Sequence, residues 1–248
     1  MTRSDPARAR RVWNAALRLR RALAPLQFAA PVTHVYDPVE YAAAAHRAYV
    51  RRFAGSRKKV VFLGMNPGPF GMAQTGVPFG EVSLVRDWMG IEEKIGRPAD
   101  EHPKRPILGF DCTRSEVSGA RLWGAIAEHW GTPDRFFSDH FVANYCPLLF
   151  MEEGGRNRTP DKLAPAEREA LFAACDTHLA AVVRALEPSW IVGIGAFAAG
   201  RARAVLGESG PRVGEVLHPS PANPRANRDW KGEARRGLVG LGLCREPG

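Results

Sequence analysis

Short runs of consecutive apolar residues are the feature that most constrains how this 248-residue chain can fold. Val60 to Leu63 and Trp190 to Ile194 contain no charged residue, and neither run alternates as a half-exposed strand would. Such runs are typical of parallel strands, because helices cover both faces of a parallel sheet. Four segments are therefore interpreted as strands, namely residues 59–64, 136–143, 190–194 and 212–217.

Helical patterns lie between these strands. In residues 165–186 the apolar side chains fall on one stripe of a long helix, and residues 119–130 are also expected to be helical. Strands that alternate with helices predict an α/β fold. We expect a three-layer α/β/α sandwich around a central, mainly parallel four-stranded sheet.

Capping signals predict where two further helices begin. Asp37 suits a helix cap and Pro38 the first helical position, while Glu40 completes a capping box ahead of a run that reaches about Phe53. The asparagine and proline at residues 223–224 have the same arrangement and predict the start of a C-terminal helix.

The N-terminal segment is rich in arginine. Val12, Ala16, Leu19 and Leu23 repeat at helical spacing, so residues 7–24 are expected to form a basic amphipathic helix that packs on or beside the fold. An organellar presequence would share the arginines, but the serine enrichment typical of such segments is missing. The length favours a single domain made by the whole chain.

The charge balance favours a polyanionic partner. Lysine and arginine together number 35 against 26 aspartate and glutamate, which gives a formal net charge of +9. A basic surface of this kind attracts nucleic acid through its phosphates, although a generally basic solvated surface would give the same count.

Cysteine spacing and hydropathy exclude several classes of protein. The four cysteines lie far apart without a C-x-x-C pair or a cysteine–histidine cluster, so no zinc or iron–sulfur site is indicated. We expect no metal and no organic cofactor. No apolar run approaches the roughly 18 residues that a membrane span needs, and a secretory signal is not evident.

Polar residues follow three of the expected strands. Asn66, Asn144 and His218 each stand just beyond a strand, where ligands bind in parallel α/β sheets. One asparagine after a strand more often caps a turn, but three such residues at one sheet edge indicate a site. Two amides and an imidazole favour hydrogen-bond recognition over nucleophilic catalysis.

Four segments resemble the single-strand-selective monofunctional uracil-DNA glycosylases, family 3 of the uracil-DNA glycosylase superfamily. The similarity runs from about residue 26 to residue 243, and its motifs are long enough to be specific. The four segments are PVTHVYDPVEYA at 31–42, GMNPGPFGMAQTGVPFGEV at 64–82, NYCPLLF at 144–150 and HPSPANPRAN at 218–227.

The resemblance implies a role for each pocket residue. Asn66 would position the attacking water, and His218 would donate a hydrogen bond to O2 of the departing uracil. Asn144 would recognise the Watson–Crick edge of a base flipped out of DNA, and Phe79 would stack on its ring. Gly68 would leave space near C5 of the base. Two methionines, Met65 and Met72, are further candidates for the pocket wall, although a plain core role suits Met72 nearly as well.

Uracil and cytosine differ at the edge that Asn144 would bind. An amide rotated by half a turn matches cytosine instead of uracil, so selectivity requires neighbours that fix its orientation. We expect these neighbours among the backbone groups of residues 145–148.

The last motif implies contacts with DNA. Its three prolines stiffen a loop that is expected to act as a wedge in duplex DNA, and Ala222 at the tip is smaller than the long basic residue expected in some relatives. Lys231, Arg156 and Arg158 are further candidates for phosphate contacts. The residues expected to contact DNA are Ser220, Pro221, Ala222, Asn223, Pro224, Arg225 and Arg228.

The expected function is removal of uracil from single- and double-stranded DNA by a monomer, in the bacterial cytoplasm or a eukaryotic nucleus. 5-Hydroxymethyluracil is a further expected substrate. Alternatives are a mismatch-directed glycosylase of the thymine-DNA glycosylase type and a non-catalytic DNA-binding module. A nucleotide cofactor bound by the GIGAFAAG turn at 193–200 is disfavoured, because the full glycine fingerprint and a following acidic residue are missing.

Overall fold

A computed structural model describes residues 5–244 of the chain. Its centre is a four-stranded sheet in the order β3-β2-β6-β7, and every neighbouring pair is parallel. The expected four-stranded parallel sheet is therefore confirmed. Its strands are β2 (Val60–Gly64), β3 (His140–Asn144), β6 (Trp190–Ile194) and β7 (Arg212–Val216).

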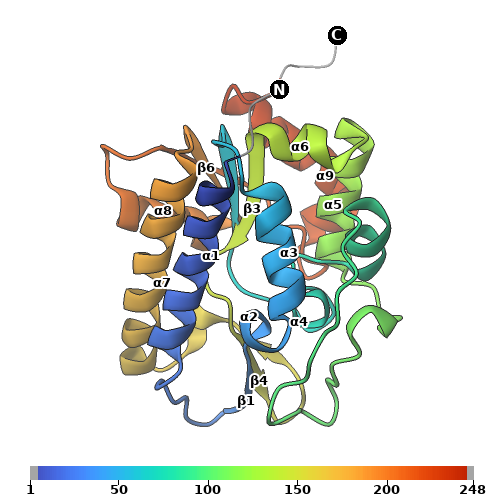
Figure 1. Cartoon of the computed structure of the whole chain (residues 1–248), viewed down its shortest axis with the longest axis vertical. Helices are drawn as coiled ribbons and strands as arrows, with labels where there is room; N and C mark the ends of the chain where they lie inside the picture. The colour runs from blue at the N-terminus through green and yellow to red at the C-terminus, as the bar shows by residue number, and fades with distance from the viewer. Residues whose placement is uncertain (1–4, 245–248) are drawn as a thin grey trace.

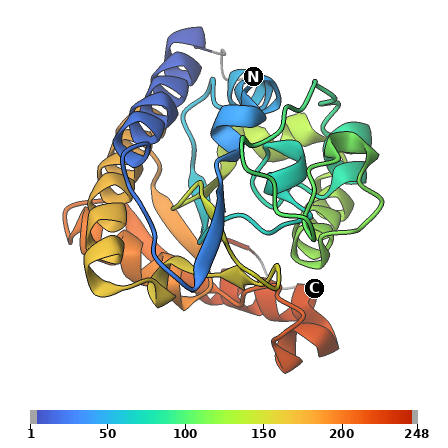
Figure 2. The same ribbon diagram turned by 90° about the horizontal axis from the view of Figure 1, so that it is seen from below.

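Helices cover both faces of this sheet, as Figures 1 and 2 show. On one face α8 (Ala196–Leu206) packs on β6 and β7, with α7 (Pro165–Leu186) and α1 (Pro6–Leu23) beside it. On the other face α5 (Val117–Trp130) packs against α9 (Pro224–Gly240), which contacts β7. This arrangement confirms the three-layer sandwich.

Several helices begin where the residues predict. Asp5 and Asp37 each accept a hydrogen bond from the backbone two residues ahead, and Asn223 does the same from Arg225. The apolar stripe of α1 is buried against α7 and α3 (Ala43–Phe53), with each member at most 5% exposed. The basic face of α1 remains outside.

The segment 37–53 is two helices rather than one. A four-residue helix α2 (Pro38–Tyr41) ends at Ala42, whose backbone leaves the helical region, and α3 then starts. Glu40 interacts with Arg20 of α1, not with the backbone of Asp37 as a capping box would require. Asp37 thus still caps α2, and the contact with Arg20 replaces the second bond of the capping box.

The segment 136–143 is only partly a strand, which corrects the sequence interpretation. Its first half lies in α6 (Pro133–Asp139), which begins at a proline, and β3 starts at His140. Phe136 and Phe137 are both buried, and the Phe137 ring stacks on Phe53 at a centroid distance of 3.8 Å. A short helix buried on several sides has the same apolar run as a strand, so periodicity does not separate them.

A second sheet that the sequence did not indicate lies beside the carboxyl ends of the parallel strands. It is antiparallel, with the order β1-β4-β5, and appears near the bottom of Figure 1. Its strands are β1 (Val32–Tyr36), β4 (Leu149–Glu152) and β5 (Asn157–Arg158). The segment at residues 64–82, named here the first motif, forms the short helix α4 (Met72–Thr75) after β2, and this helix contacts α2.

The remaining regular segments are single turns at the periphery of the fold. They are a π-helical turn at Leu84–Trp88 and two 3-10 turns at Gly109–Asp111 and Pro160–Lys162. Within residues 5–244, no helix combines the length and apolar character needed to cross a membrane.

Gly193 sets how closely α8 approaches the sheet. A Cβ at this position would lie 2.3 Å from the backbone nitrogen of Ala199, closer than real contacts allow. Gly193→Ala should therefore lower the free energy of unfolding by about 1–3 kcal/mol, the usual cost of overpacking. Urea denaturation followed by circular dichroism measures the change.

Gly200 on the same helix is the matched control, because a Cβ there would meet nothing within 4 Å. Gly200→Ala should raise stability by up to about 1 kcal/mol, since alanine is the better helix former. Equal effects of the two substitutions would contradict the close packing of α8 on β6.

Candidate active site

The ends of three parallel strands bring the polar residues into one region. Gly64 at the end of β2 pairs in register with Asn144 at the end of β3, and Asn66 follows two residues later. His218 lies two residues beyond β7, with its Cβ 3.2 Å from the Cβ position of Gly195. Glycines at the ends of β2 and β6 thus leave room for the side chains of neighbouring segments.

Asn144 and Phe79 meet over Gly64. A Cβ on Gly64 would lie 2.4 Å from Asn144 Oδ1 and 2.5 Å from Phe79 Cε2, so only glycine fits. The Phe79 ring lies 6.0 Å from the His218 ring, centroid to centroid, with the planes tilted by 44°. An amide, an aromatic ring and an imidazole therefore surround one small region.

Phe79 has an unusual backbone conformation. Its φ of 55° lies in the left-handed region, which a bulky side chain seldom adopts without support from its surroundings. The first turn of α5 supplies this support, because Gly119 approaches the Phe79 carbonyl so closely that a Cβ would lie 2.0 Å from the oxygen. Trp123 of the same helix donates a hydrogen bond to Pro78 O.

The amide of Asn144 is only half satisfied. Its Nδ2 donates to the sulfur of Met72 at 3.3 Å, whereas its Oδ1 is buried and has no hydrogen-bond partner in the described part of the protein. A buried polar atom without a partner is costly and marks a place where a ligand donor is missing. The Met72 thioether, not the backbone of residues 145–148, is the group that orients this amide.

His218 is a neutral hydrogen-bond donor. Burial lowers the pKa of its imidazole to about 4, so the ring is uncharged near neutral pH. The backbone N–H of Ser220 donates to Nδ1 at 3.1 Å, which places the ring proton on Nε2. The Nε2–H group is thus the one available to a ligand.

Asn66 presents an acceptor. Its Nδ2 donates to Leu148 O at 3.2 Å and more weakly to Pro67 O at 3.4 Å, which leaves Oδ1 free of these contacts. The neighbouring Met65 continues the pairing of β2 with β3 beyond the strand ends, because its carbonyl accepts a hydrogen bond from Cys146 N at 2.9 Å.

The space beside Gly68 is occupied by Glu116. A Cβ on Gly68 would lie 2.5 Å from Glu116 Oε2, and Gly71 is also close to this side chain. Desolvation raises the pKa of Glu116, while backbone N–H groups of Ser118 and Phe70 oppose the shift. Because Gly68 has no side chain, the carboxyl group of Glu116 fits beside it.

The motif at 218–227 forms an exposed loop that leads into α9. Pro221, Ala222 and Pro224 are exposed, and the Ser220 hydroxyl accepts from Ala222 N at 3.1 Å. Arg121 of α5 donates to Pro219 O at 3.0 Å, and it also holds Asn227, which in turn donates to Pro221 O. The loop is thus supported from behind while its tip faces solvent.

The candidate DNA-contacting cations differ in their surroundings. Arg225 is paired with Glu233, Lys231 with Glu128, and Arg158 with Glu152. Arg228 and Arg156 are exposed and form no ion pair with the described residues.

Sequence reasoning did not identify several residues around this site. Arg121 and Glu116 act through packing of α5, which no local pattern reveals. Asn157 of β5 donates to Pro67 O at 3.3 Å, and Gln74 donates to Pro106 O at 3.1 Å, but both contacts cross between distant segments. The sequence indicated the strand-end polar residues by their position, and Phe79, Gly68 and Met72 only through the resemblance of the motif.

Comparison with known proteins finds relatives over most of the chain. The model of the Uracil DNA glycosylase superfamily matches residues 52–238. A rat protein named single-strand selective monofunctional uracil-DNA glycosylase is 52% identical, covering 92% of this chain and 82% of its own. The cattle protein of that name is 51% identical, covering 92% and 84%.

A solved structure shares the fold. The crystal structure of wild-type Pedobacter heparinus SMUG2 superposes with a TM-score of 0.64 at 14% identity, covering 92% of this chain and 97% of that one. The family match extends over most of the chain, and the mammalian relatives exceed half identity across nearly all of it. The chain therefore belongs to the uracil-DNA glycosylase superfamily, within its single-strand-selective monofunctional family.

Proposed function

We propose that this protein is a monofunctional uracil-DNA glycosylase, which hydrolyses the bond between uracil and deoxyribose and leaves an abasic site in DNA for base excision repair. One observation carries the proposal. The site holds a buried acceptor without a partner, Asn144 Oδ1, together with a neutral donor, His218 Nε2–H, that is available to a ligand. Uracil offers the complementary groups, a donor at N3 between acceptors at O2 and O4. The mammalian relatives carry this activity in their names.

Asn144 is the residue proposed to distinguish uracil from cytosine. Its Oδ1 would accept from N3–H, and its Nδ2 would exchange the weak sulfur acceptor of Met72 for the stronger O4 of the base. A thioether accepts hydrogen bonds but does not donate them, so Met72 holds Nδ2 of Asn144, and not Oδ1, on its side of the amide. The amide is thus oriented for uracil before a base arrives.

His218 is proposed to stabilise the leaving base. When the bond from C1′ to N1 breaks, its electron pair goes to the base, and negative charge develops at O2. A donor already fixed by Ser220 stabilises that charge without reorganisation, and burial strengthens the interaction. The low pKa of His218 implies that a neutral imidazole supplies this hydrogen bond.

Asn66 is proposed to orient the water that adds to C1′. With its amino group engaged by Leu148 O, the Oδ1 atom is directed to accept a water proton. An amide is too weak a base to deprotonate water beforehand, which suits a path in which the sugar becomes cation-like before the water arrives. Positioning then contributes most of the acceleration.

Stacking and insertion complete the proposed cycle. Phe79 would stack on the flipped base, and the loop at residues 219–224 would enter the space that the base leaves. Ala222 at the exposed tip is small and separates paired DNA strands poorly, so the loop is better suited to single-stranded DNA. This agrees with the single-strand selectivity in the relatives' names. Such a protein acts, as a monomer, in whichever compartment holds the DNA.

Two finer assignments follow from the pocket wall. Acceptance of 5-hydroxymethyluracil is proposed because Gly68 has no side chain and Glu116 beside it offers hydrogen-bonding oxygens. The thymine-DNA glycosylase type and a non-catalytic module are less well supported, since the relatives at half identity are named for single-strand-selective uracil removal.

The purified protein should release free uracil from a single-stranded oligonucleotide in excess EDTA and leave the strand uncut. Every proposed step uses uncharged side chains of the chain itself. Chromatography measures uracil, and denaturing gels with and without alkali separate abasic from broken strands. Breaks before alkali treatment, or a requirement for added metal, would contradict the proposal.

Replacing His218 by leucine should reduce the single-turnover rate by about 10²-fold or more, the usual effect of deleting a donor to a developing anion. Binding of uracil-containing DNA should weaken much less. If rate and binding fall equally, His218 serves binding or structure rather than the departing base.

The protonation state of His218 is tested separately by ¹⁵N NMR titration. The ring should carry its proton on Nε2 at pH 7 and titrate at about 4, below the ordinary 6.5. As pH falls, His218 is protonated near pH 6.5 in the unfolded chain but only near pH 4 in the folded protein. Its contribution to the free energy of unfolding is therefore complete above pH 6.5 and is lost as pH falls toward 4.

Replacing Asn144 by aspartate should reduce uracil release by at least about 10²-fold, because the donor to O4 is removed and a carboxylate faces that oxygen. Any remaining activity should shift toward cytosine, whose amino group meets an acceptor. Single-turnover rates on matched uracil and cytosine oligonucleotides measure the shift, with folding checked by circular dichroism. Near-normal uracil release would remove Asn144 from the recognition site.

A further inference from the structure

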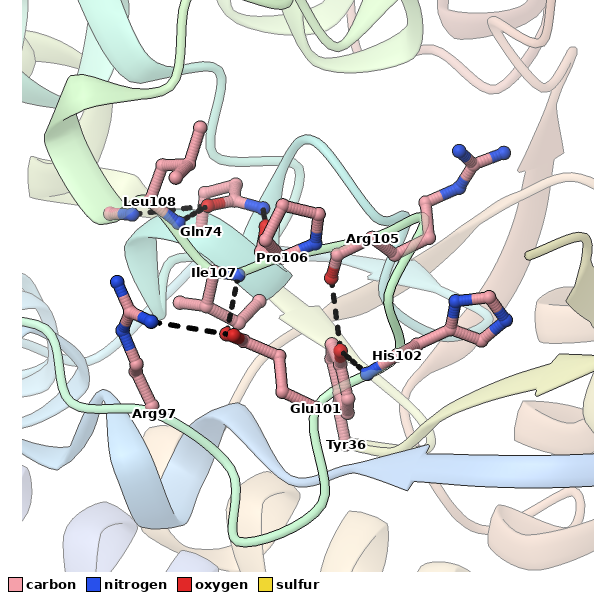
Figure 3. Close-up of polar contacts among 10 residues, drawn as sticks. Tyr36, Gln74, Arg97, Glu101, His102, Arg105, Pro106, Ile107 and Leu108 are labelled. Carbon is pink, nitrogen blue, oxygen red and sulfur yellow. Dashed lines mark hydrogen bonds and ion pairs between the residues drawn. The ribbon is translucent and has the colours of Figure 1, made fainter.

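The segment of residues 97–109 is fixed to the first motif by one buried side chain. Gln74 donates from Nε2 to Pro69 O and Pro106 O, at 3.0 and 3.1 Å, and its Oε1 accepts from Leu108 N and Gly109 N. A side-chain amide has two donors and two acceptor positions, and all four are used here. Figure 3 shows Gln74 at the centre of these contacts.

A second set of hydrogen bonds fixes the same segment to β1. The Tyr36 hydroxyl accepts from His102 N at 2.7 Å and donates to Arg105 O at 2.9 Å. Glu101 accepts from Ile107 N at 2.8 Å, so the segment is also closed on itself. The backbone at Arg105 is thereby held rigidly, while its side chain extends away from these groups (Figure 3).

Two guanidinium groups gather on one aromatic ring of the first motif. The Cζ atom of Arg105 lies 5.5 Å from the centre of the Phe70 ring, and that of Arg114 lies 4.0 Å from it. Phe70 is four residues beyond Asn66, so these cations stand beside the candidate active site. Contact with the same ring thus places two positive charges on this motif, where they attract an anion.

No internal anion neutralises this pair. Within residues 5–244, no carboxylate oxygen lies within 4.0 Å of Arg105 or Arg114. The Nε atom of Arg105 is buried without a partner, and its Nη1 donates only to the adjacent carbonyl of Lys104. The side chain of Arg114, which is exposed over the ring, forms no hydrogen bond with the described residues, and the fork of a guanidinium matches the geometry of phosphate.

We infer that Arg105 and Arg114 form a phosphate subsite that binds the DNA backbone next to the flipped nucleotide. The inference rests on the proposed function for the identity of its ligand, a phosphodiester of the strand that carries the target base. It differs from the contacts of the 218–227 loop, since it lies on the first motif. A preformed cation pair lowers the ordering cost of binding and places the strand relative to Asn66.

The test measures binding of the full chain to a fluorescent single-stranded oligonucleotide that carries a tetrahydrofuran abasic analogue. Arg105→Gln combined with Arg114→Gln should weaken binding at least about 10-fold, the scale for removing hydrogen bonds to a charged group. The slope of log affinity against log salt should also become shallower by about 0.7 for each phosphate that the variant no longer neutralises.

Neutral methylphosphonate substitutions locate the phosphate. Replacing one specific phosphate near the abasic position should weaken binding by the unmodified protein but not by the double variant. Arg184→Gln is the matched control, because it removes the same charge from an exposed position in the last turn of α7, at the amino-terminal edge of the sheet. This control should leave the sensitivity to that methylphosphonate intact.

Each outcome decides the question. If the double variant binds like the Arg184→Gln control, or if its weakening is the same for every methylphosphonate position, the subsite inference is wrong. Arg114 is exposed, so Arg114→Gln alone decides it if the double variant does not fold. Failure of the unmodified protein to release uracil would contradict the proposed function instead, and the binding data would still decide whether the arginines contact phosphate.

Discussion

Parallel pairing of β2 with both β3 and β6 is the constraint on which the other features depend. It brings the ends of strands that are distant in sequence to one edge, and it requires helices on both faces to supply the connections. Close approach at that edge is possible only because Gly64 has no side chain where the Asn144 amide and the Phe79 ring meet. Backbone pairing thus determines both the position and the size of the pocket.

The sequence predicted the parts of the fold that have a local cause. The α7 stripe, the four-stranded sheet and the caps at Asp37 and Asn223 follow from patterns within a few residues. The two buried phenylalanines of α6 were misread because a short buried run has no diagnostic period. In the site, Asn66, Asn144 and His218 were visible as strand-end residues, but the orientation of Asn144 by Met72 depends on a contact across 72 residues.

Charge and recognition are separated in this protein. The three side chains that face the proposed base position, Asn144, Phe79 and His218, are neutral, since a low pKa keeps the imidazole uncharged, and the formal net charge of +9 comes from other residues. Neutral donors and acceptors discriminate between bases, and the surface cations supply attraction to DNA regardless of sequence.

The unusual backbone of Phe79 links the pocket to the completion of folding. Its left-handed conformation is maintained by the first two turns of α5, through the close approach of Gly119 and the hydrogen bond from Trp123 to Pro78 O. A chain in which α5 has not docked would relax Phe79 to an ordinary conformation and have no stacking surface. If Phe79 stacks on the base as proposed, base recognition therefore arises only with the fully packed state, whereas the surface cations of a partly folded molecule would still attract DNA.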